Sequence, residues 1–155
     1  MLNVGDQAPD FKLFSSDKAV VSLSDYRGKN VVVLFFPMAF TGVCTTELCT
    51  MRDSIGLYTD LNAEILAISV DSVFSLDVFK KQEAYNFPLL SDFNKEVSAA
   101  YSSLFETFVM DMRGVSKRAA FVVDTNGIIQ YAEVLGTAGE LPNFEAINAT
   151  LASLN

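Results

Sequence analysis

Histidine and tryptophan are both absent from this 155-residue sequence. The absence of histidine excludes Ser-His-Asp hydrolysis, Cys-His proteolysis and metal sites built from imidazole ligands, because each of these needs a histidine side chain. It also removes the side chain that most readily serves as a general base near neutral pH. Any reaction carried out by this chain therefore needs another nucleophile or another acid.

Positive charge and cysteine are both scarce. The chain has 11 Lys and Arg residues against 19 Asp and Glu residues, and its net charge of −8 makes nucleic acid or an anionic membrane a poor partner. The two cysteines, Cys44 and Cys49, are too few and too close together for the disulfide framework of a small secreted scaffold. The two cysteines therefore either have a chemical role or occur here by chance.

Signals for export, membrane insertion and phosphate binding are also missing. Residues 1–6 contain neither the basic nor the apolar part of a secretory signal. The longest nearly apolar run, 31–40, contains Pro37 and has half of the roughly 20 residues that a membrane-spanning helix needs. The two glycine-rich phosphate-binding motifs, Gly-x-x-x-x-Gly-Lys and Gly-x-Gly-x-x-Gly, do not occur. We expect one domain over residues 1–155, located in the cytoplasm, that uses no cofactor and no metal.

Hydrophobic runs in the first half predict a strand, a helix and a second strand. The hydrophobic runs at 31–36 and 65–70, the second interrupted only by Ser69, are typical of strands that are covered on both faces. Between them, five residues recur three or four positions apart, on one face of a helix: Cys44, Leu48, Met51, Ile55 and Tyr58. This order favours a parallel crossover.

The second half predicts further helices at 75–85, 94–101 and 144–154, and a pair of strands. The paired runs 119–123 and 128–134 flank an Asn-Gly step, which predicts an antiparallel hairpin. We therefore expect the α/β class, with a central mixed β-sheet flanked by helices on both faces. The order of elements resembles a thioredoxin-like fold with an N-terminal extension before the first central strand.

Cys44 falls just after the first predicted strand, at the start of the predicted helix. The free N–H groups and partial positive charge of a helix N-terminus favour a thiolate over a thiol, so a reactive sulfur can exist there without histidine. The competing interpretation is a buried, inert cysteine, since Cys44 shares the apolar face of the helix. Position alone does not separate the two.

Cys49 lies off that face. Five residues along an ideal helix leave it about 140° around from Cys44 and ~7.5 Å further along the axis. Bridged cysteines have Cα atoms ~4.4–6.8 Å apart, so a Cys44–Cys49 disulfide would require the first helical turns to unwind. The alternative for Cys49 is an incidental small residue.

The chain resembles the peroxiredoxin family at four positions in the right order. Pro37, Thr41 and Cys44 match the spacing of that family's active-site signature, and Arg118, about eighty residues away by sequence order, begins a late strand where the family has an arginine. Residues 5–11 and 87–92 resemble the family's opening and a mid-chain element. The similarity spans nearly the whole chain and points to the AhpE-like and bacterioferritin-comigratory (PrxQ) branches.

The resemblance implies a role for each of these residues. Pro37 would shield the thiolate, the Thr41 hydroxyl would engage the peroxide, and Cys44 would attack it. Arg118, which always carries its charge, would hold the thiolate and stabilise the leaving oxygen. Glu47 resembles a family carboxylate that orients active-site arginines, although an acid that simply suits the helix dipole is an equal alternative.

The two branches differ in how the sulfenic acid formed on Cys44 is resolved. Cys49 resembles the resolving cysteine of many bacterioferritin-comigratory proteins, whereas AhpE-like proteins typically work with one cysteine. The resemblance implies reduction of hydrogen peroxide and organic hydroperoxides, with recycling by thioredoxin or a glutaredoxin-like protein. It is also compatible with a homodimer.

Three other functions compete with this one. A thiol-disulfide oxidoreductase of thioredoxin type would have a Cys-x-x-Cys pair, whereas the spacing here is Cys-x-x-x-x-Cys. A noncatalytic domain would not need Thr41, Cys44 and Arg118 together. A one-cysteine peroxidase, in which Cys49 does not resolve, is left open by the sequence.

Overall fold

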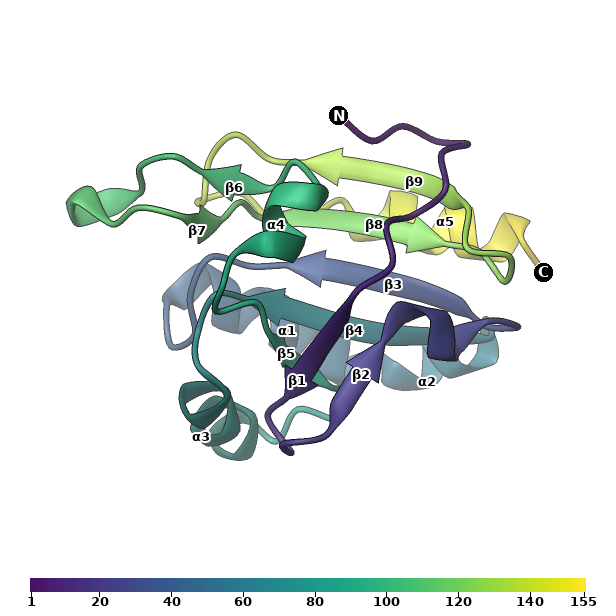
Figure 1. Cartoon of the computed structure of the whole chain (residues 1–155). Coiled ribbons are helices and arrows are strands. Elements are labelled where there is room, and N and C mark those ends of the chain that lie inside the picture. The colour runs from purple at the N-terminus through teal and green to yellow at the C-terminus, as the bar shows by residue number, and fades with distance from the viewer.

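The computed structural model describes residues 1–155 and contains two β-sheets. The strands of the larger sheet are β1 (Lys12–Ser15), β2 (Val20–Ser22), β3 (Asn30–Phe35), β4 (Ala63–Ser69), β5 (Leu89–Ser91), β8 (Ala119–Val123) and β9 (Ile129–Val134). They lie side by side in the order β2-β1-β5-β4-β3-β8-β9. A second sheet pairs β6 (Leu104–Phe105) with β7 (Val115–Ser116), beside the main sheet (Figure 1).

Strand β3 occupies an interior position in the larger sheet. All six of its residues are buried, which is why its sequence is an unbroken hydrophobic run. It pairs in parallel with β4 and antiparallel with β8. The predicted parallel crossover and the mixed character of the sheet are therefore confirmed.

Helices cover the two faces of this sheet unequally (Figure 1). The helical segments are η1 (Leu23–Tyr26), α1 (Gly42–Asp53), α2 (Ile55–Asp60), α3 (Val73–Glu83), α4 (Glu96–Ala100), η2 (Val109–Asp111) and α5 (Phe144–Ser153). Helices α1, α2, α3 and α5 share one hydrophobic core, to which Leu48, Tyr58, Phe79 and Ile147 belong. The opposite face is covered by the N-terminal segment, η1 and the short α4.

The predicted hairpin joins β8 to β9. Gly127 adopts a φ of +86°, a left-handed conformation that favours glycine, and a Cβ there would lie 2.6 Å from the guanidinium of Arg27. Asp124 Oδ1 accepts hydrogen bonds from the backbone N–H groups of Asn126 and Ile128, at 2.9 and 3.0 Å. The turn is thus closed by both backbone conformation and side-chain hydrogen bonds.

Five short strands, β1, β2, β5, β6 and β7, were missing from the sequence-based expectation. The N-terminal extension contains β1 and β2, and β1 joins the main sheet by pairing with β5. Strand β5, in turn, pairs in parallel with β4. Strands of three or four residues leave too little alternation to be detected, so tertiary pairing decides them.

The single helix expected through Cys44 and Tyr58 is instead two helices. The helix is interrupted at Ser54, whose N–H bonds back to the carbonyl of Met51 at 3.2 Å and ends α1 before α2 begins. Serine, aspartate and glycine are weak helix formers, and Asp53, Ser54 and Gly56 stand together here. The apolar pattern persists because Tyr58 still reaches the same core.

Candidate active site

The loop that leads from β3 into α1 is held by neighbouring elements. The backbone N–H of Ala39 donates to Asp71 Oδ2 at 2.9 Å, and the Ser69 hydroxyl donates to the same oxygen at 2.6 Å. Phe40 has a φ of +69° and packs its ring 5.1 Å from that of Phe79. These contacts fix the approach to the helix from the end of β4 and from α3.

Cys44 lies in the first turn of α1, as expected from the sequence. Thr41 is the N-cap residue of this helix, and Cys44 is the third residue after it. The Cys44 side chain is a free thiol that is 1% exposed. Its position near the unpaired N–H groups of the first turn favours negative charge on the sulfur.

Arg118 is distant from Cys44 in the sequence but contacts it in the fold. It immediately precedes β8, and the antiparallel pairing of Ala119 with Phe35 brings it to the end of β3 where α1 begins. Its Nη1 donates to Cys44 Sγ at 3.4 Å, and its Nη2 donates to the Ala138 carbonyl at 2.8 Å. Arg118 is 1% exposed, so its charge acts on the thiol with little solvent screening.

Glu47 completes this arrangement one helical turn after Cys44. Its Oε1 accepts a hydrogen bond from Arg118 Nη1 at 2.6 Å. The side chain of Arg118 is 1% exposed and that of Glu47 is fully buried. Burial raises the pKa of Glu47 to about 7, although the Arg118 guanidinium opposes this shift and Glu133 adds to it. Burial alone would lower the pKa of Arg118, but the charges of Glu47 and Cys44 outweigh it and raise that pKa.

Two polar atoms of this pair are left without a partner. Glu47 Oε2 and Arg118 Nε are both buried and make no hydrogen bond. A buried group in this state carries a desolvation cost, which other features of the protein must offset. The pair is therefore better explained by a functional requirement at Cys44 than by its contribution to stability.

A pocket of about 240 Å³ opens over Cys44. Its lining residues come from four segments of the chain: Pro37, Thr41, Gly42, Val43, Cys44, Phe108, Val109, Arg118 and Ala138. The Thr41 hydroxyl donates to the Met38 carbonyl at 2.8 Å, which leaves its oxygen free to accept a hydrogen bond from a molecule in the pocket. Pro37 is buried at the pocket wall.

Three contributors to this pocket were missed by sequence reasoning. Phe108 and Val109 come from the segment between β6 and β7, where no periodic pattern marked them. Ala138 contributes a backbone carbonyl, which leaves no trace in a sequence. The five residues expected around the first thiol, Pro37, Thr41, Cys44, Glu47 and Arg118, are all brought together.

Cys49 lies outside this pocket, on a different side of α1. It is half-buried and packs at the edge of the core, although it lies off the helix face that carries Cys44. Its Sγ lies 3.6 Å from Glu83 Oε2 and 3.7 Å from the Tyr85 hydroxyl. Both cysteines are free thiols.

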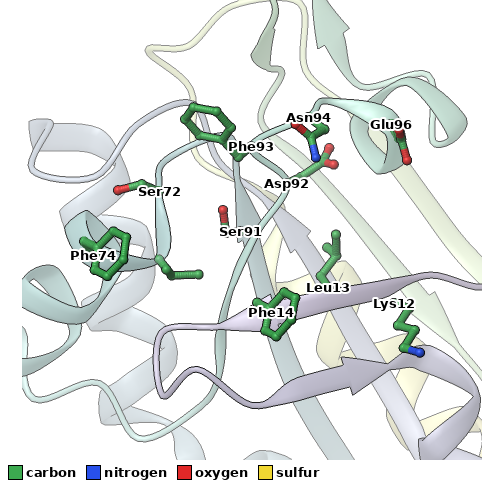
Figure 2. Close-up of a pocket in the computed structure, with 11 residues that line it drawn as sticks. Lys12, Leu13, Phe14, Ser72, Phe74, Ser91, Asp92, Phe93, Asn94 and Glu96 are labelled. Atoms are coloured by element: carbon green, nitrogen blue, oxygen red, sulfur yellow. The ribbon is translucent and has the colours of Figure 1, made fainter.

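A larger pocket, of about 510 Å³, lies elsewhere on the molecule (Figure 2). Leu13 and Phe14 from β1 face Phe74 from α3 across it, and none of the residues discussed around Cys44 lines it. The structure has no cluster of three or more cysteine, aspartate and glutamate side chains suited to a metal ion. None of its helices combines the length and the apolar character needed to cross a bilayer.

The arrangement around Cys44 suits nucleophilic attack on a small molecule with a leaving oxygen. A guanidinium and a helix N-terminus stabilise the thiolate, and they also stabilise charge that develops on an oxygen nearby. No proton-abstracting base is needed when the nucleophile is already deprotonated. Apart from Thr41, Cys44 and Arg118, the pocket is lined by apolar residues and glycine.

Residues 4–132 of the chain match the AhpC/TSA family. Alkyl hydroperoxide reductase E of Mycobacterium tuberculosis is 43% identical over 137 residues, which cover 86% of this chain and 86% of that protein. A thioredoxin-dependent peroxide reductase of Drosophila mitochondria is 39% identical over 139 residues, which cover 83% of this chain and 57% of that protein.

Solved structures of related names superpose closely on this chain. The crystal structure of the peroxidoxin BcpB from Mycobacterium tuberculosis superposes with a TM-score of 0.88 at 26% identity, covering 100% of this chain and 99% of that one. The peroxiredoxin Q of Xylella fastidiosa gives a TM-score of 0.87 at 25% identity, covering 99% of this chain and 97% of that one. The expected thioredoxin-like α/β fold is confirmed.

Proposed function

The chain belongs to the AhpC/TSA family and is a thiol-dependent peroxidase of the peroxiredoxin type, and we propose that Cys44 carries its reaction. The observation that supports this most is the buried Cys44 thiol at a helix N-terminus, with Arg118 Nη1 at 3.4 Å from its sulfur in a pocket open to small molecules. The substrates are hydrogen peroxide and organic hydroperoxides, and no cofactor or metal takes part.

The first step is attack by the Cys44 thiolate on the terminal peroxide oxygen. An S–O bond forms as the O–O bond breaks, so Cys44 becomes a sulfenic acid and the peroxide leaves as an alcohol or water after taking up a proton. Arg118 stabilises the charge on the leaving oxygen. Thr41 accepts a hydrogen bond from the peroxide, while Pro37 excludes water from one side of the sulfur.

Glu47 acts as a positioning residue in this scheme. Its carboxylate holds Arg118 Nη1, the same nitrogen that faces Cys44 Sγ. The opposite end of the guanidinium is held by the Ala138 carbonyl. With both ends fixed, the guanidinium needs no rearrangement when charge develops in the pocket.

Cys49 resolves the sulfenic acid in the second step. Its sulfur displaces the hydroxyl group of the Cys44 sulfenic acid, which gives a disulfide and water. The first turns of α1 have to open for this, and their sequence favours opening because Thr45, Thr46 and Thr50 bond back to carbonyls four residues earlier. Thr41 also makes no side-chain capping hydrogen bond.

A dithiol partner then reduces the disulfide. We take this partner to be thioredoxin or a glutaredoxin-like protein, in line with the name of the Drosophila relative. Turnover returns Cys44 and Cys49 to thiols, so a reducing compartment such as the cytoplasm suits the cycle. The acidic charge of −8 argues against nucleic acid as a partner, and a homodimer is the assembly we propose.

Mass spectrometry of the reduced protein after one equivalent of peroxide tests this cycle. We expect a loss of two hydrogens in the native chain and a stable added oxygen in Cys49→Ser. An added oxygen in the native chain, with Cys49 still open to alkylation, would identify a one-cysteine peroxidase. A thiol-disulfide oxidoreductase without peroxidase activity would react with peroxide no faster than a free thiol does. Neither the loss of two hydrogens nor the added oxygen would then appear at a higher rate.

A further inference from the structure

The thiol of Cys49 sits against two polar side chains that the peroxide-reduction step does not use. Glu83 is the last residue of α3, and Tyr85 follows it by two positions. Cys49 Sγ donates a hydrogen bond to Glu83 Oε2 at 3.6 Å, within the longer range that sulfur allows. This sulfur therefore lies within hydrogen-bond distance of a carboxylate.

We propose that Glu83 is the proton acceptor for Cys49 when Cys49 attacks the Cys44 sulfenic acid, and that Tyr85 positions the same sulfur. This inference rests on the proposed role of Cys49 as the resolving thiol. A sulfur must lose its proton to form a disulfide, and an adjacent carboxylate removes it without a hydroxide ion from solvent. The chain has no histidine for this purpose.

The geometry around Glu83 is fixed by contacts between α1 and the end of α3. Arg52 Nη1 donates to the backbone carbonyl of Glu83, and Asn86 Nδ2 donates to the carbonyl of Arg52 at 3.2 Å. Ala84 takes a left-handed conformation, with φ at 53°, that turns the chain between Glu83 and Tyr85. The half of α1 that contains Cys49 is thus anchored to the segment that supplies its neighbours.

The other half of α1 is held by Arg118 instead, through Cys44 and Glu47. It contains Thr45 and Thr46, which bond back along the helix, and its link to Tyr85 is a single hydrogen bond of 3.4 Å from the Tyr85 hydroxyl to the Thr45 carbonyl. When the first turns open, Cys44 moves toward Cys49 while Cys49 stays beside Glu83. Opening also breaks the bond to Thr45, which frees the Tyr85 hydroxyl to donate to the sulfur.

Tyr85 stays protonated while it does this. Burial raises its pKa, and contact with Cys49 and the charge of Glu83 raise it further, against a smaller opposing effect of Arg52. Its O–H is therefore a donor throughout the working range of the enzyme. The charged groups that face Cys49 are Glu83 from α3 and Arg52 from α1, and Arg52 is paired with Asp53.

Atoms and electrons balance in this step. Cys49 passes its proton to Glu83 as its sulfur bonds to the Cys44 sulfur. The S–O bond of the sulfenic acid breaks, and the departing hydroxide takes a proton from Glu83 to become water. Glu83 is a carboxylate again at the end, so it acts once in each cycle without net change.

The test is the rate of disulfide formation in Glu83→Gln, measured by acid quench and mass spectrometry after one equivalent of hydrogen peroxide. We expect this rate to fall by about 100-fold near neutral pH, a loss typical for removal of a general base. We also expect the rate in Glu83→Gln to rise tenfold per pH unit where the native rate changes little, because solvent hydroxide then replaces the carboxylate. Glu83→Asp should restore the native pH profile in part.

Two further variants separate proton transfer from structure. Tyr85→Phe should slow disulfide formation by about tenfold, the scale of one hydrogen bond to a charged group, with its pH dependence unchanged. Asp77→Asn removes the same charge from α3, away from Cys49, where Asp77 pairs with Lys81, and should leave the rate unchanged. Sulfenic acid formation on Cys44 should stay at the native rate in all four variants.

The rate of disulfide formation separates the role of Glu83 from that of Cys49. If Glu83→Gln forms the disulfide at the native rate, or faster, with the native pH profile, then Glu83 is no proton acceptor and this inference fails while the role of Cys49 stands. If the native chain keeps a stable added oxygen on Cys44, the proposed role of Cys49 fails, and this inference fails with it. The native chain is therefore measured first.

Discussion

The two cysteines of α1 sit five positions apart on one helix, but their surroundings are opposite in charge. Cys44 is buried against the guanidinium of Arg118, at the helix N-terminus. Cys49 is half-buried against the carboxylate of Glu83 and the hydroxyl of Tyr85, in the middle of the helix. The first sulfur therefore faces a positive charge and the second a negative one.

This contrast shows that the helix alone does not determine the surroundings of its cysteines. Arg118 is 74 positions from Cys44 in the sequence, and Glu83 is 34 positions from Cys49. Each partner arrives from an element that packs against α1 from a different direction. The proposed division of labour between an attacking and a resolving thiol therefore depends on which elements flank the helix.

Exchanging each thiol for a hydroxyl is expected to have the largest effect. Cys44→Ser should abolish peroxide consumption, because a serine hydroxyl in this pocket has no base to deprotonate it. Cys49→Ser should consume one equivalent of peroxide at the native rate and then stop being recycled by thioredoxin. Both are measured by peroxide consumption with and without reductant. Native-rate consumption by Cys44→Ser would contradict the assignment.

Removing the cation from Cys44 makes its surroundings more like those of Cys49. Arg118→Met should slow the first turnover by about 100- to 1,000-fold, the range seen when one preorganised donor is removed from a charged transition state. It should also move the rise of the rate with pH to higher pH. Arg113 is exposed, so Arg113→Met is the matched control for charge. An unchanged pH–rate profile in Arg118→Met would remove Arg118 from its role.

Glu47→Gln tests the buried acid on the Cys44 side. Burial raises the pKa of Glu47 from 4.5 to about 7, so between these values the folded chain binds more protons at this group than the unfolded chain. The stability contributed by this group is therefore present below pH 4.5 and declines as pH rises through about 7. The total decline is about 3 kcal/mol.

Urea unfolding at acidic and at slightly alkaline pH checks this expectation. The difference in unfolding free energy between the native chain and Glu47→Gln should shrink or reverse as pH rises. Glu64 is a half-exposed acid that pairs with Lys29 at the surface, so Glu64→Gln should show no such trend. A parallel pH dependence in the native chain and Glu47→Gln would mean that Glu47 is ionised throughout this range.

Thr41→Val is expected to have the smallest effect of this set. Thr41 is exposed at the pocket mouth, and its hydroxyl oxygen is free to accept from a peroxide. Loss of one hydrogen bond to the reacting molecule should lower kcat/KM by about tenfold, with the pH profile unchanged. Stopped-flow measurement of Cys44 oxidation provides the value. Thr45→Val, one turn further along the helix, is the matched control.

Long, periodic segments were predicted correctly from the sequence, and short ones were not. The runs around Val33, Leu66 and Phe121 are continuous because both faces of those strands are buried. Strands β1 and β5 escaped detection because three or four residues carry no reliable period. Ser54 divides the long helix without disturbing its apolar spacing, so only the structure revealed the break.

The residues around Cys44 and Cys49 were likewise predicted only in part from the sequence. Pro37, Thr41 and Cys44 stand close together in the sequence, so their spacing was informative. Phe108 and the Ala138 carbonyl were missed because pocket walls made of loop side chains and backbone carbonyls follow no pattern. Glu83 was missed for another reason: an acid at the end of a helix has no visible link to a cysteine on a different one.

By itself, the sequence excluded chemistry that needs histidine, since the chain has none, and placed Cys44 at the start of a helix. These are local facts, set by composition and by periodicity along a few turns of chain. Tertiary structure decided which charge each sulfur faces. The antiparallel pairing of β3 with β8 brings Arg118 to Cys44, and the packing of α3 beside α1 brings Glu83 to Cys49. Coulomb interactions depend on distance in space, which the order of residues along the chain does not give.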